Sequence, residues 1–303
     1  MKPSTQFRKM IESDEITVAP GVHDPLTARI AEVVGFDAVY MTGWGTSVSK
    51  GLANARLMTM TEMVDTMSNV TDAVNIPVFA DAEEGFGGPL NTIRTVKKSI
   101  KAGLAGIHLE DEKPPGSLMS REVLTQDQAV QKIQAATDTR NQLDEDFVII
   151  ARSKAHESAH GSLDESIKRV QAYHDAGADM VNVTVDNRSD YERVSQEVDA
   201  PLLVTGALVQ LPPEEFEEMG VDVVMYALSG TWATILGVYT YTEQLRRNPT
   251  GTMEKLEAEL EDIPLPEIDG FAEAFQQTKK YKPEEIQDYE KLDSVIYSGV
   301  DEE

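Results

Sequence analysis

The fold is decided by the stretch Val78-Phe79-Ala80-Asp81-Ala82-Glu83-Glu84-Gly85-Phe86-Gly87-Gly88 and its sequel, Ala105-Gly106-Ile107-His108-Leu109-Glu110-Asp111. Two apolar runs each end in acids, and the helical pattern from Leu90 to Ala102 joins them. This is typical of a βαβ unit with two parallel strands, whose carboxyl ends meet at one sheet edge. Carboxylates gathered there beside a Gly-rich turn suit Mg²⁺. The simpler alternative is that the acids cap helices and solvate the surface.

The 303-residue chain is strongly acidic, with 53 Asp and Glu against 27 Lys and Arg and a formal net charge of −26. This excess argues against nucleic acid or anionic membranes as partners. The acids are spread along the chain, which favours the surface of a salt-adapted (halophilic) cytoplasmic protein over disorder. Cysteine is absent, which excludes thiolate metal sites and a cysteine nucleophile. No apolar run approaches the length of a membrane span, and Met1 to Thr5 lacks a signal peptide's apolar core.

Eight apolar runs alternate with helical segments, which predicts an α/β fold, a (β/α)8 TIM barrel with additional C-terminal helices. The expected strands are 16–19, 37–41, 78–81, 105–110, 147–152, 180–185, 201–204 and 221–226. The first is expected to end at the Pro20-Gly21 turn. No strand-end Gly-x-Gly-x-x-Gly is present, so a nucleotide-binding sheet is the weaker alternative. We expect a barrel domain over 1–250 and a helical extension over 251–303.

In a barrel, the carboxyl ends of the strands carry the chemistry. In this sequence they hold acids, a strand-end arginine and small polar or glycine groups. The residues are Thr42, Gly43, Trp44, Asp81, Glu83, Glu110, Asp111, Arg152, Lys154, Thr184, Asp186, Thr205, Gly206 and Ser229. A metal, a guanidinium and backbone donors together suit a small multi-carboxylate or a 2-oxo acid. Simpler alternatives are that Arg152 pairs structurally with the acids and that Thr42-Gly43 is only a tight turn. For Trp44 the simpler alternative is that its side chain closes the mouth of the barrel. We expect His108 to have a structural role.

Several segments, taken in order, resemble the isocitrate lyase/phosphoenolpyruvate mutase superfamily over about residues 7–245. They are Pro20–Asp24, Gly35–Gly43, Ala80–Asn91, Ala105–Asp111 and Ile150–Arg152. The resemblance implies a barrel that uses Mg²⁺, with Mn²⁺ as an alternative, and acts on 2-hydroxy or 2-oxo di- and tricarboxylates. It also implies a homotetramer whose C-terminal helices, here within Ile268 to Tyr297, swap between subunits.

The resemblance also implies roles for individual residues. Asp81, Glu83 and Glu110 would hold the ion, directly or through water. The substrate's carboxylate would bind to Thr42, Gly43 and Trp44, and Arg152 would contact the substrate. The metal loop, with the form Asp-x-Glu-x-Gly-Phe-Gly-Gly, is more similar to that of isocitrate lyase than to that of methylisocitrate lyase.

The sequence departs from the family at the loop that supplies a proton. The lyases carry Lys-Lys/Arg-Cys-Gly-His there, whereas this chain has Lys113-Pro114-Pro115-Gly116-Ser117-Leu118, and proline cannot transfer a proton. The family's Ala-Arg-Thr-Asp-Ala has become Ala151-Arg152-Ser153-Lys154-Ala155. A strand-end glutamate and asparagine have become Thr184 and Thr205, and a loop aspartate has become Asn54.

Three functions stay open. The first is a Mg²⁺-dependent C–C lyase that cleaves isocitrate or 2-methylisocitrate, a 2-hydroxy tricarboxylate, to succinate and a 2-oxo acid. Lys113, Tyr40 or water would then protonate the carbanion. The second is an oxaloacetate decarboxylase, or a phosphonopyruvate- or phosphoenolpyruvate-type mutase or hydrolase, which needs no cysteine. The third is a binding subunit without turnover. The form of the metal loop favours the lyase.

Overall fold

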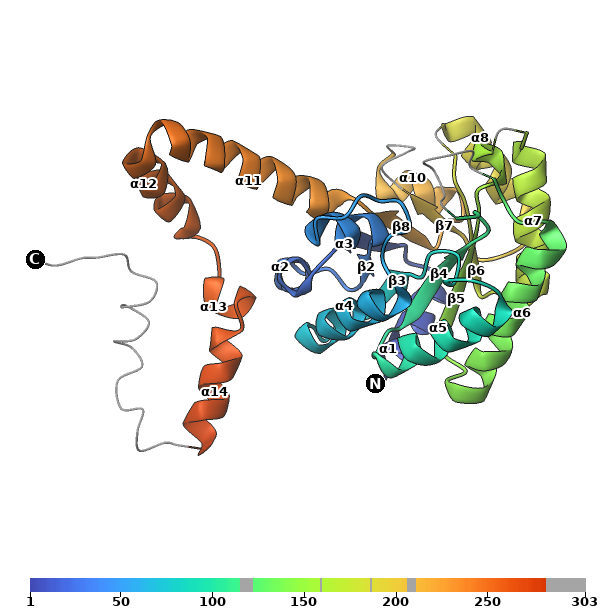
Figure 1. The fold of residues 1–303 in the computed structure, drawn as a ribbon, viewed down its shortest axis with the longest axis horizontal. Coiled ribbons are helices and arrows are strands. Elements are labelled where there is room, and N and C mark those ends of the chain that lie inside the picture. The colour runs from blue at the N-terminus through green and yellow to red at the C-terminus, as the bar shows by residue number, and fades with distance from the viewer. Residues whose placement is uncertain (115–121, 159, 186, 206–210, 282–303) are drawn as a thin grey trace, which may run out of the picture. The chain divides into compact units, whose positions relative to one another are not determined.

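The computed structural model describes residues 1–114, 122–158, 160–185, 187–205 and 211–281. Eight parallel strands pair in the order β6-β5-β4-β3-β2-β1-β8-β7. A parallel bridge from Val181 on β6 to Leu202, just before β7, joins the two outer strands, so the sheet is a nearly closed barrel. Helices surround these strands (Figure 1). The predicted TIM barrel is therefore confirmed.

The strands are β1 (Thr17–Val22), β2 (Val39–Met41), β3 (Val78–Asp81), β4 (Gly106–Glu110), β5 (Val148–Ser153), β6 (Met180–Val183), β7 (Leu203–Thr205) and β8 (Val223–Tyr226). The first helices are α1 (Pro3–Ile11), α2 (Pro25–Val34), α3 (Gly43–Ser49), α4 (Met60–Ala73), α5 (Pro89–Lys101), α6 (Gln126–Leu143) and α7 (Leu163–Asp175). They are followed by α8 (Arg188–Glu197), α10 (Pro213–Glu218), α11 (Ser229–Arg247), α12 (Pro249–Leu260), α13 (Leu265–Ile268) and α14 (Phe271–Tyr281). A short 3-10 helix spans Ala155–Glu157.

The chain forms two compact units, Met1–Trp232 and Ala233–Glu303. The predicted domain boundary at residue 250 and the swap of C-terminal helices stay predictions, and residues 282–297 of the expected swap segment lie outside the described residues. Of the helices in the described ranges, none is both long and apolar enough to cross a membrane.

One local expectation and one of the simpler alternatives are wrong. The first strand runs through Pro20 and Gly21 to Val22, because it pairs with β8 as far as Pro20 and then with β2. Gly21 is needed there because a Cβ would lie 2.0 Å from the carbonyl oxygen of Ala227. Thr42-Gly43 is more than a tight turn, since Thr42 is the N-cap of α3. Two glycines in the first turn of α3 hid its helical tendency.

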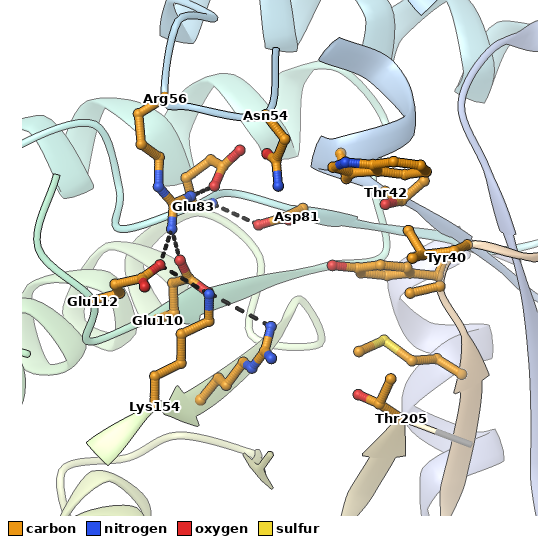
Figure 2. A pocket seen from close by; sticks show the side chains of 15 residues that line it. Tyr40, Thr42, Asn54, Arg56, Asp81, Glu83, Glu110, Glu112, Lys154 and Thr205 are labelled. Atoms are coloured by element: carbon orange, nitrogen blue, oxygen red, sulfur yellow. Dashed lines mark hydrogen bonds and ion pairs between the residues drawn. The ribbon is translucent and has the colours of Figure 1, made fainter. Parts of the chain in front are cut away.

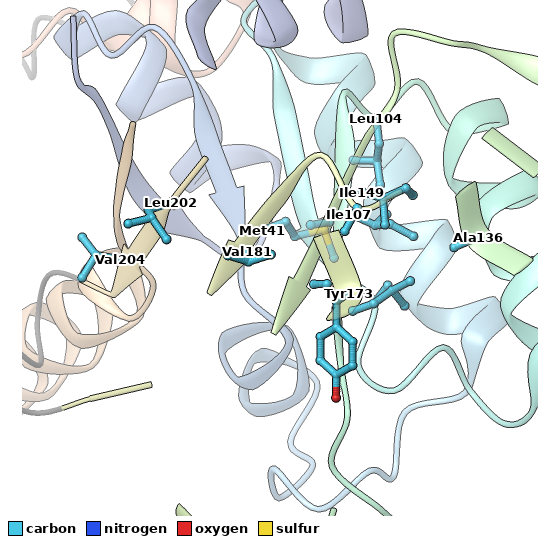
Figure 3. Packing of buried hydrophobic residues seen from close by; sticks show 14 of the residues in the cluster. Met41, Leu104, Ile107, Ala136, Ile149, Tyr173, Val181, Leu202 and Val204 are labelled. Carbon is cyan, nitrogen blue, oxygen red and sulfur yellow. The ribbon is translucent and has the colours of Figure 1, made fainter. Parts of the chain in front are cut away.

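The strands bury their side chains on both faces of the sheet. On β5, Val148 and Ile150 join one apolar cluster and Ile149 joins another, as the two-residue period of a strand requires. The first cluster fills the barrel and includes Phe7 of α1, which stacks on Phe79 with ring centroids 4.8 Å apart. The second packs the strands against the helices (Figure 3). This double burial fixes the strand ends rigidly enough to position a site.

Candidate active site

A cavity of about 230 Å³ lies where the carboxyl ends of the strands meet. It is lined by Tyr40, Thr42, Trp44, Asn54, Arg56, Asp81, Glu83, Glu110, Glu112, Arg152, Lys154, Thr205, Met225, Ala227 and Leu228. Figure 2 shows Arg56, Glu83, Glu110, Glu112 and Lys154 gathered on one side, with Tyr40, Thr42 and Thr205 on the other. A small cavity with a charged wall and a hydroxyl-bearing wall suits a small polar anion.

Asp81 and Glu83 meet the first turn of α3 at Gly43. One oxygen of Asp81, Oδ1, accepts a hydrogen bond from the backbone N–H of Glu83 at 2.8 Å. A Cβ at Gly43 would lie 2.7 Å from both the other oxygen, Asp81 Oδ2, and Glu83 Oε1. A side chain at this position would displace the two carboxylates, so glycine lets oxygens of Asp81 and Glu83 approach the start of α3.

Arg56 extends its guanidinium into the acids. It forms ion pairs with Glu83 and Glu110, with Glu112 at 2.9 Å, and with Glu84 at 3.9 Å. Only 13 % of its side chain is exposed. The φ angles of Arg56 (57°) and Glu83 (53°) lie in the left-handed region, which costs side chains on the order of 1–3 kcal/mol each. Two strained residues thus bind each other inside the cavity.

Lys154 and Glu112 form a second ion pair beside Arg56. The Lys154 ammonium lies 2.9 Å from Glu112 and 3.1 Å from Glu110. Burial and the charge of Arg152 lower the pKa of Lys154 to about 8, against the opposing pull of Glu112. Burial raises the pKa of Glu112, but the charges of Lys154 and Arg56 outweigh this, so that pKa is lowered overall. Near neutral pH both members of the pair are charged.

Glu112→Gln is expected to lower the pKa of Lys154 further below 8, because the Glu112 carboxylate is the neighbour that raises it. An NMR titration of the Lys154 side chain, with EDTA present, measures the shift. Glu122→Gln is the control, since Glu122 pairs with the exposed Lys113 and should leave Lys154 unchanged. A higher pKa for Lys154 in Glu112→Gln would contradict this electrostatic assignment.

Arg152 pairs with acids, as the simpler alternative had it, and its contact with the substrate stays a prediction. Its Nε donates to the hydroxyl of Thr184 at 2.8 Å, and its guanidinium lies 3.6 Å from Glu110 and from Glu157. It pairs with acids, and it also lines the cavity. Thr184 holds Arg152 and is not among the residues that line the cavity, whereas Thr205 is.

Tyr40 presents a phenol to the cavity from β2. Burial raises its pKa well above 10, and the charge of Asp81 adds to the shift. Its oxygen lies 3.3 Å from Nδ1 of His108, whose pKa is held well below 6.5 by burial. Tyr40 therefore keeps its proton at neutral pH and His108 is uncharged. His108 lies on the same face of β4 as Glu110, as a regular strand requires.

Lys113 lies outside the cavity lining. A bridge pairs Glu112 with Val123, and the Lys113 N–H donates to the carbonyl of Glu122 at 2.8 Å. In such extended backbone successive side chains point to opposite faces. Glu112 thus faces the acids, while the Lys113 side chain is 43 % exposed and pairs with Glu122 at 3.3 Å. Residues 115–118 of the expected donor loop lie outside the described residues, and a catalytic role for Lys113 stays a prediction.

Asp111 anchors the end of β5 beneath the cavity. Its carboxylate accepts from Tyr173 at 2.7 Å, from Ser153 at 2.9 Å and from the Lys154 N–H at 2.8 Å, and it contacts Arg169 at 3.3 Å. This buried network holds Lys154 in position.

Asp111→Ala is expected to lower the free energy of unfolding by about 3–5 kcal/mol, because the buried Tyr173 hydroxyl, the Ser153 hydroxyl and the Lys154 N–H lose their shared acceptor. Denaturant unfolding measures the loss. Asp175→Ala, on the exposed side of α7, should change it by less than about 0.5 kcal/mol. Equal small effects for the two variants would count against the anchor.

Sequence reasoning missed Arg56 and Glu112, and it placed Lys154 at a strand end without giving it a role. Glu112 carried a signal, because strand alternation places it on the same face as Glu110. Arg56 lies in a loop between α3 and α4 that has no periodic pattern, so only the structure finds it.

The donor set fits a magnesium ion. Mg²⁺ prefers carboxylate oxygens, and oxygens of Asp81 and Glu83 already converge beside Gly43. Within the described ranges, however, no three acidic or histidine side chains are arranged as a closed metal site. Figure 2 shows the Arg56 guanidinium between Glu83, Glu110 and Glu112. The residues therefore suit the ion, and a guanidinium competes with it.

A family model described as phosphoenolpyruvate phosphomutase matches residues 7–246. The chain belongs to the isocitrate lyase/phosphoenolpyruvate mutase superfamily. Its relatives in the superfamily are named lyases and mutases, and the chain is an enzyme of this group. The resemblance read from the sequence is thus confirmed.

Two relatives and two solved structures show how close this likeness is. The chain is 34 % identical to 2,3-dimethylmalate lyase of Eubacterium barkeri, covering 84 % of this chain and 91 % of that protein. It is 36 % identical to the probable 2-methylisocitrate lyase 2 of Corynebacterium glutamicum, covering 74 % of each. A crystal structure of 2,3-dimethylmalate lyase matches with a TM-score of 0.85 and 30 % identity over 93 % of this chain and 96 % of that one. A phosphonopyruvate hydrolase complex with oxalate and Mg²⁺ matches with a TM-score of 0.84 and 26 % identity, over 94 % and 100 % of the two chains.

Proposed function

We propose that this superfamily member is a Mg²⁺-dependent lyase that cleaves a C–C bond of a 2-hydroxy di- or tricarboxylate. The observation that carries the proposal is that the first turn of α3 and the oxygens of Asp81 and Glu83 meet at Gly43. A 2-hydroxy acid carries its carboxylate and its oxygen on adjacent carbons. The first-turn N–H groups of α3 have no partner within the helix and can bind the carboxylate while the adjacent oxygen faces the acids.

Asp81, Glu83 and Glu110 would hold the ion, which would supply Lewis-acid polarisation of the substrate's oxygens. Members of the superfamily are Mg²⁺-dependent, which supports this choice. The Thr42 side chain makes no capping bond, so its hydroxyl is available to the carboxylate. Arg152, held by Thr184, is placed to bind a second carboxylate and orient the bond that breaks.

Cleavage moves the electrons of the C–C bond onto the departing fragment. The hydroxyl oxygen loses its proton and becomes the carbonyl of a 2-oxo acid. The departing enolate-like fragment takes a proton at carbon and leaves as a carboxylate. Among the described side chains that line the cavity, Tyr40 and Lys154 each carry a proton that they can donate to such a carbanion. They take the place of the cysteine that the family's lyases use.

The second candidate is a reaction that passes through an enolate and needs no proton from the loop that carries the cysteine in the family's lyases. Oxaloacetate decarboxylation, or a mutase or hydrolase reaction on phosphonopyruvate or phosphoenolpyruvate, needs the same binding of a 2-oxo acid. The placement of Lys113 outside the cavity favours this candidate, because the family's donor loop then supplies no proton from that residue.

The deciding experiment is proton NMR of the protein with each of five acids, in Mg²⁺ and then in EDTA. The acids are 2,3-dimethylmalate, 2-methylisocitrate, isocitrate, oxaloacetate and phosphonopyruvate. A 2-oxo acid released from one of the first three only with Mg²⁺ is the expected result. Pyruvate from oxaloacetate alone, faster than with Asp81→Asn protein, would move the assignment to a decarboxylase. Mg²⁺-dependent binding of one of these acids without any product would favour the third function, a binding subunit without turnover.

We also propose that the chain assembles as a homotetramer. Large apolar side chains of α11 are exposed in the single chain, with Ile235, Leu236, Val238 and Tyr239 between 47 % and 69 % accessible. Such a row supports burial against another copy. Light scattering coupled to size-exclusion chromatography is expected to give four times the chain mass of 33.4 kDa, and a monomer would refute the assembly.

A further inference from the structure

We propose that Arg56 is a built-in counter-cation of the acidic site. Its guanidinium occupies the place between Glu83, Glu110 and Glu112 that a divalent ion would need, so the ion binds only when Arg56 withdraws. The inference rests on the proposed function for the identity of that ion. It concerns how tightly the site binds that ion, a property that the proposed reaction does not determine.

The first support is the charge balance of the cavity. Four acids line it, Asp81, Glu83, Glu110 and Glu112, against the three cations Arg56, Arg152 and Lys154. Without Arg56 the excess of negative charge would double from one to two. Carboxylates at close range repel each other unless a cation lies between them. Arg56 lies between these acids and therefore offsets part of that repulsion.

The second support is the geometry of Arg56 itself. Four glutamates within 4 Å hold one guanidinium that is mostly buried. Its backbone nonetheless adopts a left-handed conformation that side chains rarely take. Strain of this kind persists only where the surroundings fix the residue, and here the acids do so. Glu83, one of the proposed ligands, shares the same strain.

The third support is the way in which withdrawal can occur. Arg56 lies in the loop between α3 and α4 rather than on a strand, and its long side chain can swing without a change in the barrel. Lys154 remains on Glu110 and Glu112 when Arg56 leaves. Binding of the ion and retention of Arg56 then oppose each other, and by linkage each weakens the other by the same factor.

The test is isothermal titration of Mg²⁺ into the full chain after removal of metal with EDTA and dialysis, at one fixed KCl concentration. Arg56→Met removes the charge and keeps most of the volume, and Arg56→Gly also relieves the backbone. Both are expected to bind Mg²⁺ at least tenfold more tightly than the unchanged protein. Arg188→Met is the matched control, because Arg188 pairs with Glu192 and Glu215 on the surface and should leave the affinity unchanged.

Thermal unfolding gives a second readout. In EDTA, Arg56→Met is expected to melt at a lower temperature than the unchanged protein, and Mg²⁺ should raise its melting temperature by the larger amount. If the unchanged protein binds Mg²⁺ and neither Arg56 variant binds it more tightly, the counter-cation is refuted while the proposed function stands. If no variant binds Mg²⁺, the metal of the proposed function is refuted with it.

Discussion

Asp81→Asn is expected to reduce Mg²⁺-dependent turnover by at least about 10³-fold, the effect of losing roughly 4 kcal/mol of stabilisation of the transition state. The amide keeps the oxygen that accepts from the Glu83 N–H, so the turn after β3 should hold its shape. What is lost is the charged oxygen that faces Gly43. Steady-state kinetics and Mg²⁺ calorimetry on the same preparation measure the two consequences together.

Asp72→Asn is the matched control for this variant. Asp72 is exposed near the end of α4 and is not among the residues that line the cavity, so its loss should change neither turnover nor Mg²⁺ affinity. Unfolding of Asp81→Asn must match that of the parent protein in EDTA for the comparison to hold. Full turnover in Asp81→Asn would remove Asp81 from the metal site.

Tyr40→Phe is expected to lower kcat by about 10²–10⁴-fold with little change in KM, which is the effect of removing a proton donor that acts in the transition state. The ring remains to pack against Phe79, whose centroid lies 5.2 Å away, so the barrel interior should stay filled. Because the pKa of Tyr40 is raised well above 10, its proton should be available throughout the neutral and mildly alkaline range.

Tyr191→Phe controls for the loss of a buried phenol. Tyr191 is 1 % exposed, packs against Phe216 and lies on α8, outside the residues that line the cavity. Its removal should leave kcat unchanged. A kcat for Tyr40→Phe within about twofold of the parent value would assign the proton to another group, and Lys154→Met would then be the variant to measure.

Most of the cavity could be predicted because parallel strands end at one edge. That rule alone brings together Asp81, Glu110 and Arg152, and the short turns after the strands add Thr42, Glu83 and Lys154. Lateral pairing fixes these positions before any loop is considered, as with Glu110 and Arg152, which are register partners on β4 and β5.

The other contacts of the cavity could not be predicted, because they depend on the path of the chain outside the strands, which no periodic pattern encodes. Whether Lys113 or Glu112 faces the acids is decided by the bridge from Glu112 to Val123, a pairing of residues eleven apart. Thr184 directly follows β6, yet it holds Arg152 instead of lining the cavity. Arg56 reaches the acids through a left-handed backbone that its residue type disfavours, so propensity argued against its position.

The central claim is that the acids and the first turn of α3 together bind, through a divalent ion, the carboxylate and the adjacent oxygen that a 2-hydroxy acid and its 2-oxo acid product share. Calorimetry with oxalate, a small dianion that carries the same pair of groups, tests this without knowledge of the substrate. We predict that the unchanged protein binds oxalate in the presence of Mg²⁺ and not in EDTA. Asp81→Asn protein is expected to bind oxalate in neither condition. Oxalate binding of equal affinity with and without Mg²⁺, or none in either condition, would contradict the account.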